Sequence, residues 1–142
     1  MRTGTFLLEG PNAVADAMAD GIVLELFCTE DTAADWEGHG PLVTLVAEHV
    51  LAKICDASSP QGVVAIGAME PATLDDLPAD GLVIACHEVN DPGNAGALIR
   101  IADAVAAAGV VLCEGSADPY HPKTVRAAAG SLTHLPVVPG IA

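Results

Sequence analysis

The first 70 residues alternate between short apolar runs and amphipathic stretches. The runs "TFLLEG", "IVLELFCT", "PLVTLV" and "GVVAIGA" have the length of β-strands and are bounded by glycine, proline or charged residues. Between them, "PNAVADAMAD" places a proline in the first helical turn and Val14 four residues before Met18, which is the spacing of one helical face. The stretch "AEHVLAKICD" has the same helical spacing. This alternation predicts an α/β layer architecture.

Residues 81–142 repeat the pattern with longer apolar strands. The run "GLVIACHEV" is nearly continuous, which is typical of a central parallel strand covered by helices on both faces. The loop "NDPGNAG" then leads into a helix from about Ala95 to Ala108, and "GVVLCEG", "HPKTVRAAAG" and "THLPVV" predict strand, helix and strand. Three parallel strands with two helices are few for an independent α/β domain. We therefore expect the chain to be part of a longer protein.

The segment between these two patterns is "MEPATLDDLPADG". It has neither the spacing of a helix nor the apolar run of a strand. It contains Pro71, Pro78 and four acidic residues. The sequence thus predicts one domain over residues 1–70, an acidic linker over 71–80 and a second domain over 81–142.

Composition excludes several classes of protein. Half of the 142 residues are apolar, which is enough for a real core, but every apolar run is shorter than the roughly 18 residues of a membrane span. No secretion signal opens the sequence, so we expect a cytoplasmic protein without a membrane partner. The four cysteines form no C-x-x-C pair and no cysteine–histidine cluster, so they predict buried free thiols and no metal site.

The net charge of −14 argues against a general polyanion binder, because affinity for nucleic acid depends largely on Lys and Arg. Its distribution is uneven. Residues 1–80 hold fourteen acids and only two bases, Arg2 and Lys53. The other three bases, Arg100, Lys123 and Arg126, fall within 27 residues of one another in the second domain.

The loop "NDPGNAG" is the strongest candidate for a ligand site, since open α/β sheets bind ligands beyond the carboxyl ends of their strands. Gly93 and Gly96 allow a close backbone approach, and Asn94 is placed to cap the following helix. The G-x-G-x-x-G and P-loop motifs are both absent. On a helical wheel, Arg100 and Asp103 project away from the apolar stripe and could pair. The predicted buried stripe of this helix is Leu98, Ile101, Ala102 and Val105.

The stretch "VNDPGNAGALIRIADAVAAAGVVLCEGSADPYHPKTVRAAAGSLTHLPV" resembles the first motif and following segment of the SpoU (TrmH-type) RNA 2′-O-ribose methyltransferases of the SPOUT superfamily. Pro92, Gly93, Asn94, Gly96 and Arg100 fall in register with that family's N-P-G-N-x-G motif and arginine. In the first domain, "FLLEGPNAVADAM" and "SPQGVVAI" resemble the small α/β substrate-binding domain of such enzymes. The resemblance implies this domain followed by the first half of a parallel-sheet, trefoil-knot methyltransferase domain.

The same resemblance implies transfer of a methyl group from S-adenosylmethionine to a ribose 2′-hydroxyl of rRNA or tRNA. Arg100 would orient the ribose and stabilise developing charge, a role favoured over proton abstraction because arginine stays protonated, and Asn94 would fix the loop and the arginine. Lys123 and Arg126 would contact RNA phosphates. The family's later motifs, with most of the methyl-donor pocket, would lie beyond residue 142. The chain alone is therefore expected to be inactive, and the complete protein to be a homodimer through its methyltransferase domain.

Two other interpretations remain at this point. The chain could be an RNA- or ribosome-binding module without catalysis. It could also be a nucleotide-binding α/β domain of redox type, which requires an acid at the end of the second strand to hold a ribose, and Glu114 fits that position.

Overall fold

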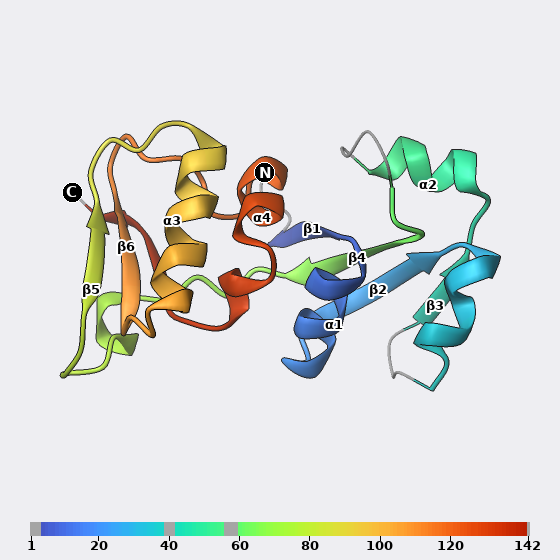
Figure 1. Ribbon diagram of the computed structural model, residues 1–142, viewed down its shortest axis with the longest axis horizontal. Coiled ribbons are helices and arrows are strands. Elements are labelled where there is room, and N and C mark those ends of the chain that lie inside the picture. Colours follow the sequence, from blue (N-terminus) through green and yellow to red (C-terminus); the bar gives the residue numbers. More distant parts are fainter. Residues whose placement is uncertain (1–3, 39–41, 56–59, 142) are drawn as a thin grey trace. The chain divides into compact units, whose positions relative to one another are not determined.

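The computed structural model describes residues 4–38, 42–55 and 60–141. The chain divides into two compact units, residues 1–69 and residues 70–142, which are drawn in Figure 1. Each unit combines a β-sheet with helices, so the predicted α/β class is confirmed. None of the helices in these described ranges is long and apolar enough to cross a lipid bilayer.

The first unit contains a four-stranded mixed sheet with the order β1-β4-β2-β3. Strand β4 runs antiparallel to both β1 and β2, whereas β2 and β3 are parallel. In chain order the elements are β1 (Thr5–Glu9), α1 (Pro11–Ala19), β2 (Val23–Cys28), a 3₁₀ helix η1 (Glu30–Trp36), β3 (Leu42–Leu45), α2 (Glu48–Ile54) and β4 (Val63–Ala68).

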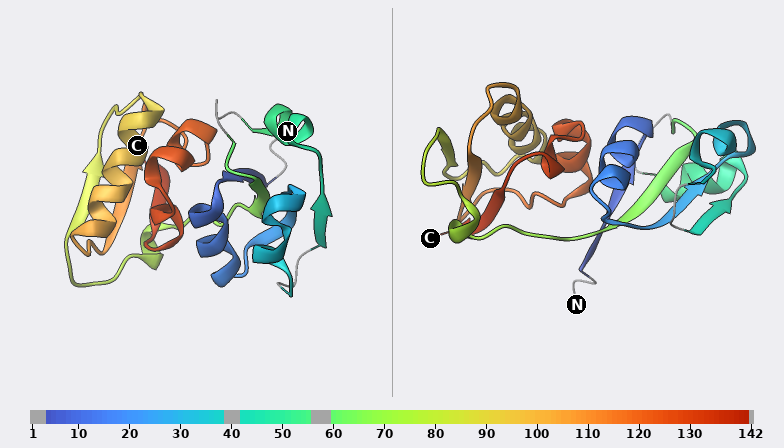
Figure 2. Two further views of the ribbon diagram at one scale, coloured as in Figure 1. Left: turned by 45° about the vertical axis from the view of Figure 1, so that its right-hand side comes forward. Right: turned by 90° about the horizontal axis from the view of Figure 1, so that it is seen from below.

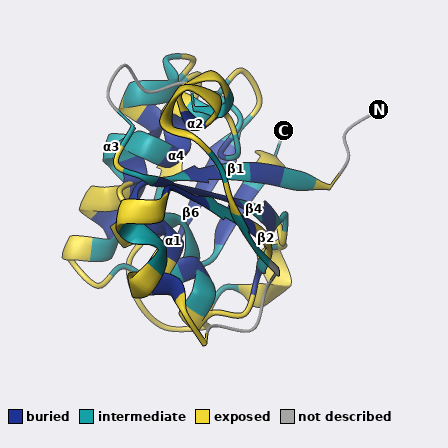
Figure 3. Cartoon of the chain, turned by 90° about the vertical axis from the view of Figure 1, so that its right-hand side faces the viewer, coloured by how far each residue is buried: buried dark blue, intermediate teal, exposed yellow. Residues whose placement is uncertain are grey.

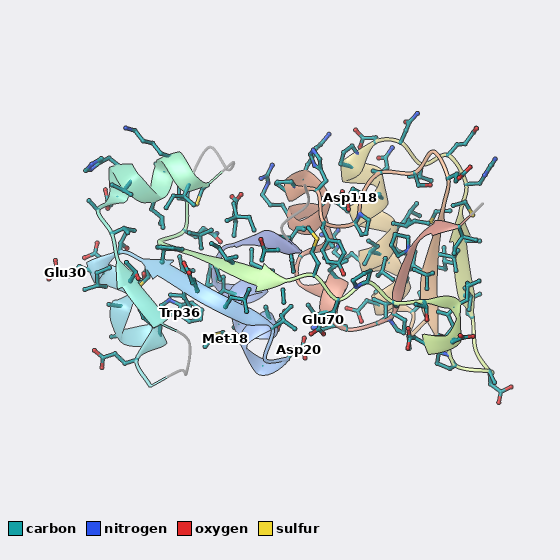
Figure 4. All side chains as sticks on the ribbon, turned by 180° about the vertical axis from the view of Figure 1, so that it is seen from behind. Met18, Asp20, Glu30, Trp36, Glu70 and Asp118 are labelled. Atoms are coloured by element: carbon teal, nitrogen blue, oxygen red, sulfur yellow. The ribbon has the colours of Figure 1, made fainter. Side chains whose placement is uncertain are left out.

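The core of the first unit forms around β4, which is mostly buried (Figure 3). Helix α1 packs Ala13, Val14 and Ala17 inward, and its first residue is the predicted proline, which needs no hydrogen-bond partner for its nitrogen. Trp36 at the end of η1 is only 6% exposed and is labelled in Figure 4. The apolar pattern gave no sign of η1, which is a short 3₁₀ segment.

The second unit contains a three-stranded parallel sheet with the order β5-β6-β7. Its elements are a 3₁₀ helix η2 (Leu74–Asp76), β5 (Val83–Cys86), α3 (Pro92–Ala104), β6 (Gly109–Cys113), α4 (Pro122–Ala128), a 3₁₀ helix η3 (Ser131–Thr133) and β7 (Val137–Ile141). Three parallel strands and two α-helices are the arrangement that the sequence predicts. Residues before β5 also pack within this unit, since the backbone N–H of Ala72 donates to the Val137 carbonyl (3.3 Å).

The position of β5 in the sheet differs from the prediction. Within the described part of the chain β5 pairs with β6 alone, so it is an edge strand, and Val83 is 37% exposed. The central strand is β6, in which Val110, Val111 and Leu112 are buried. An apolar run shows that a strand can be buried but does not fix its place in the sheet, which depends on pairing.

The buried face of α3 also differs from the predicted stripe. Ile101 and Val105 are 52% and 56% exposed, whereas Ala95, Ile99 and Ala102 are fully buried. Leu98 is partly buried against the same core. Apolar residues lie on both sides of this helix, and the face that packs inward is the one that carries Gly96. That face meets β6 and α4 in a core that includes Ile99, Ala102, Val110, Leu112 and Ala128.

Helices α3 and α4 pack side by side over the parallel sheet (Figure 2). Their backbones meet at Gly96, which is buried in the first half of α3. A Cβ atom at this position would collide with the Thr124 carbonyl oxygen and would lie 2.6 Å from the Ala127 Cβ and 2.9 Å from the Ala128 nitrogen. The absence of a side chain at residue 96 therefore sets the distance between the two helices.

Gly96→Ala should destabilise the protein, although alanine is the better helix former by up to about 1 kcal/mol. The clash involves backbone atoms of α4 that cannot rotate away, so we expect a net loss of about 1–3 kcal/mol in the free energy of unfolding. Urea denaturation followed by circular dichroism measures this loss. Ala104→Gly, at an exposed position of the same helix, is the control for helix propensity alone. A stabilised Gly96→Ala variant would show that the contact is not tight.

Candidate functional site

The loops that follow β5 and β6 meet at the carboxyl end of the parallel sheet. Ser116 joins them, because its hydroxyl donates to the Cys86 carbonyl (3.1 Å) and accepts from the Val89 N–H (3.2 Å). The Ala117 N–H also donates to the Val89 carbonyl (2.8 Å). These bonds fix the residues immediately before the loop "NDPGNAG", at the sheet edge where ligands of open α/β folds bind.

Asp91 caps the N-terminus of α3. Its Oδ1 accepts a hydrogen bond from the Asn94 N–H (2.9 Å), and Pro92 follows in the first helical position. Asn94, the predicted cap, is instead the third residue of the helix, and its side chain is exposed. The hydrogen bond from Asn94, together with the Lys123 ammonium, lowers the pKa of the Asp91 carboxyl.

Lys123 reaches the same carboxylate from the first turn of α4. Its Nζ lies 3.0 Å from Oδ2 of Asp91, and the two side chains are 53% and 45% exposed. Arg126, the other basic residue of this helix, lies half-buried in its last turn. The two side chains predicted to contact RNA phosphates therefore lie three residues apart on α4, about one helical turn from each other, and Lys123 already has an acidic partner.

Arg100 is an exposed residue in the middle of α3. It lies six positions after Asn94, so the two are separated by roughly 9 Å along the helix axis and by about 120° around it. The structure thus brings them onto one helix but on different faces. Asp103, considered as a partner for Arg100, instead pairs with His134 beyond α4, with 2.8 Å between Oδ2 and Nδ1.

Cys28 and Cys86 are buried, as predicted, whereas Cys55 and Cys113 are only partly buried. Burial raises the pKa of the Cys86 thiol, and the neighbouring Cys113 raises it further. Among the described residues, no group of three or more His, Cys, Asp or Glu side chains is arranged to hold a metal ion.

The first unit has a pocket beside α2. It is lined by Thr29, Glu48, Leu51, Ala52, Pro60 and Gly62. Thr32 contacts one of these residues, since its hydroxyl donates to the Gly62 carbonyl (2.7 Å). Lys53 is exposed on the same helix. Arg2, the other base of this unit, lies outside the described residues. Polar and apolar residues therefore both line the pocket, and the charged residue among them is the acidic Glu48.

Comparison with known proteins covers both units. The model of the SpoU rRNA Methylase family matches residues 81–140, and the model of the MRM3-like substrate binding domain matches residues 1–65. The chain is 36% identical, over 140 residues, to the 23S rRNA (guanosine(2553)-2'-O)-methyltransferase RlmP of Bacillus subtilis, which covers 96% of this chain and 55% of RlmP. The chain belongs to the SpoU rRNA methylase family.

Solved structures of SpoU proteins have the same fold. AviRb from Streptomyces viridochromogenes, crystallised with the cofactor AdoMet, superimposes with a TM-score of 0.88 at 30% identity over 99% of this chain and 57% of AviRb. An AdoMet-bound rRNA methyltransferase from Sinorhizobium meliloti has a TM-score of 0.84 at 34% identity, over 99% of this chain and 56% of its own. This SpoU chain spans about half the length of the relatives it matches.

Two residues that organise the SpoU loop were missed by the sequence reasoning. Asp91 carried a usable signal, because an acid directly before a proline is typical of a helix start. Ser116 carried none, since its two bonds join segments that are about 30 residues apart. Glu114, which the redox interpretation required, is exposed, and its backbone N–H donates to the Ile141 carbonyl (2.7 Å).

The Asp103–His134 pair should make the second unit sensitive to acid. Hydrogen bonds from Ser131 and then His134 lower the pKa of the Asp103 carboxyl. A carboxyl with a lowered folded-state pKa stabilises the protein above its unfolded-state pKa of about 4, and this contribution is lost as the pH falls through the folded-state pKa. Asp103→Asn should therefore lose less stability than the wild type below about pH 4.

Urea unfolding at a series of pH values from neutral to about 2.5 measures this difference. Asp80→Asn, at an exposed position of the same unit, is the matched control. Equal acid sensitivity of Asp103→Asn and the wild type would contradict the assignment.

Proposed function

We propose that this chain supplies the substrate-binding unit and the first part of the catalytic domain of an S-adenosylmethionine-dependent 2′-O-ribose methyltransferase that acts on rRNA or tRNA. One observation carries the proposal. The family motif lies at the carboxyl end of the parallel sheet and leads into a helix that presents Arg100 to solvent. The relatives named as rRNA methyltransferases, and the AdoMet-bound SpoU structures, support the same activity.

The sheet edge around this motif is compatible with the methyl donor. S-adenosylmethionine supplies an activated methyl group on a positively charged sulfur, and Glu88 and Glu114 expose carboxylates on the loops after β5 and β6. Ligands of open α/β sheets bind at this edge. We assign the donor to the edge as a whole and no single residue of this chain to its binding.

Arg100 serves the acceptor side of the reaction. A ribose 2′-hydroxyl is a weak nucleophile and loses its proton as its oxygen gains the methyl group, so negative charge develops on that oxygen. A guanidinium remains protonated and offers several donors in a fixed fork. Arg100 would orient the ribose and its phosphate and stabilise this charge, while the proton leaves to solvent. Asn94, in the first turn of the same helix, would hold the loop in place.

The first unit would recognise RNA by shape and hydrogen bonds. It corresponds to the substrate-binding domain model, yet among the described residues its only lysine or arginine is Lys53.

Contacts from Lys123 and Arg126 to RNA phosphates remain predictions for the second unit.

We also propose that the complete protein acts as a homodimer in the cytoplasm. Exposed apolar side chains in the methyltransferase part support an interface there. Ile101 and Val105 on α3 and Leu82 before β5 are each more than half exposed. Covering them with a second copy would remove this apolar surface from water.

Arg100→Ala and Arg100→Lys should each lower methyl transfer by the full-length protein by about two to three orders of magnitude. Lysine keeps the charge but not the forked geometry, and neither change creates a cavity, because Arg100 is exposed. Transfer of labelled methyl groups to RNA and the thermal midpoint are measured together. Asp103→Ala, three residues further along α3, is the control and should keep near-wild-type turnover.

Wild-type turnover in Arg100→Ala would refute the catalytic role. Equal inactivity of Asp103→Ala would refute it too. A full-length protein that binds RNA but transfers no methyl group would favour the non-catalytic RNA-binding interpretation.

RNA binding by the chain should depend only weakly on salt. Each phosphate neutralised contributes about 0.7–0.9 to the slope of log K against log salt, so five Lys and Arg residues limit the slope to about four. Lys53→Met should reduce the slope by about one if the first unit contacts the backbone there. Titrations at several salt concentrations measure both values. A slope near ten would contradict recognition by shape.

A further inference from the structure

We infer that Asp91 and Lys123 form a brace between α3 and α4 that positions the motif loop and Arg100 for methyl transfer. The inference rests on the proposed function. It assigns Lys123 a positioning role that differs from the predicted contact with an RNA phosphate.

The two oxygens of Asp91 have separate tasks. Oδ1 accepts from the Asn94 N–H at 2.9 Å and so fixes the first turn of α3. Oδ2 accepts from the Lys123 ammonium at 3.0 Å and so ties that turn to the start of α4. One carboxylate thus links the residue that begins the catalytic helix to a second helix 32 positions later in the chain.

The position of Lys123 is unfavourable for α4 alone. The N-terminal turn of a helix carries partial positive charge, so a cation there is normally avoided and an acid is preferred. The first turn of α4 contains no acidic residue, and its cap is His121, whose Nδ1 accepts from the Lys123 N–H (3.2 Å). The Asp91 carboxylate provides the negative charge that this turn lacks. The lysine is therefore stabilised by its partner on α3.

Gly93 leaves room for the brace. A Cβ at this residue would lie 3.0 Å from Oδ1 of Asp91 and 3.3 Å from Cε of Lys123, so the ion pair closes directly over the glycine. Less than one helical turn further along, Gly96 presses α3 against Thr124 and Ala127 of α4. The two contacts hold the first half of α3 on α4 at two successive points. Arg100 follows one turn later on the same rigid helix.

A lysine in this pair is a poor candidate for a phosphate contact. Its ammonium already donates to Asp91, and this carboxylate would repel a phosphate that approached the remaining N–H groups of the same ammonium. Loss of Lys123 should consequently change the turnover of bound RNA rather than the salt dependence of RNA binding.

The test compares Asp91→Asn, Lys123→Met and the double variant in the full-length protein. Asparagine still caps a helix but carries no charge for Lys123, so it removes the brace and keeps the cap. Lys123→Arg is the conservative variant that can still reach the carboxylate, and Asp80→Asn is the exposed control. The readouts are kcat and KM for RNA, and the salt slope of RNA binding. Circular dichroism confirms folding, which should tolerate these changes because the Lys123 and Asp91 side chains are each about half exposed.

Each single variant should lower kcat by roughly tenfold, because a small displacement of a catalytic group is costly. The double variant should be no slower than either single one, since both remove the same contact. KM and the salt slope should stay unchanged, and Lys123→Arg should retain most of the turnover.

Two results would overturn the brace while leaving the proposed function intact. The first is wild-type kcat in Asp91→Asn and Lys123→Met when Arg100→Ala is inactive. The second is a Lys123→Met variant with a raised KM and a salt slope smaller by about one, beside an unaffected Asp91→Asn, which would mark a phosphate contact. A wild-type protein without methyl transfer would overturn both the proposed function and the brace.

Discussion

The second unit depends on a missing side chain. At Gly96 the backbones of α3 and α4 touch, and the three atoms nearest to a Cβ at this position all belong to α4. The face of α3 that carries this contact is the one that points inward, and Ala95, Ile99 and Ala102 on it are fully buried. The contact also brings the first turns of both helices within reach of one another. The Asp91–Lys123 pair joins the starts of these two helices at 3.0 Å.

Each part of the candidate site is held in place by a neighbouring part of the second unit. The sheet places the ends of β5 and β6 side by side, and Ser116 joins the two loops that leave them. Asp91 then converts the end of one loop into the start of a helix. Arg100 needs no partner of its own to be well placed, because its backbone belongs to a helix fixed at its first turn and at Gly96. The position of the exposed Arg100 side chain is thus set by the buried contacts that hold its helix in place.

Much of this fold could be predicted from local patterns, since strand length, proline at helix starts and glycine-rich loops act within a few residues of one another. The family could be predicted from the motif that ends at Arg100 for the same reason. The predictions that were wrong concern how one element packs against or pairs with another. Apolar runs do not tell an edge strand from a central one, so β5 was misplaced. Hydrophobicity selected Ile101 and Val105 for the core, whereas the face of α3 that packs inward is the one on which Gly96 allows close contact with α4. The role of Ser116 depends on a pairing of loops that no local signal describes.

Because basic residues are scarce in this chain, the position of each one matters more for binding a polyanion. A protein with many lysines and arginines can hold a polyanion by charge alone, and the loss of any single one matters little. This chain has five, against nineteen acids, and Lys123 is already engaged with Asp91. A polyanionic substrate would be repelled by most of the surface and attracted at few points. Productive binding would then require those points to be in the correct place, so that geometry rather than total charge would determine which RNA reaches Arg100.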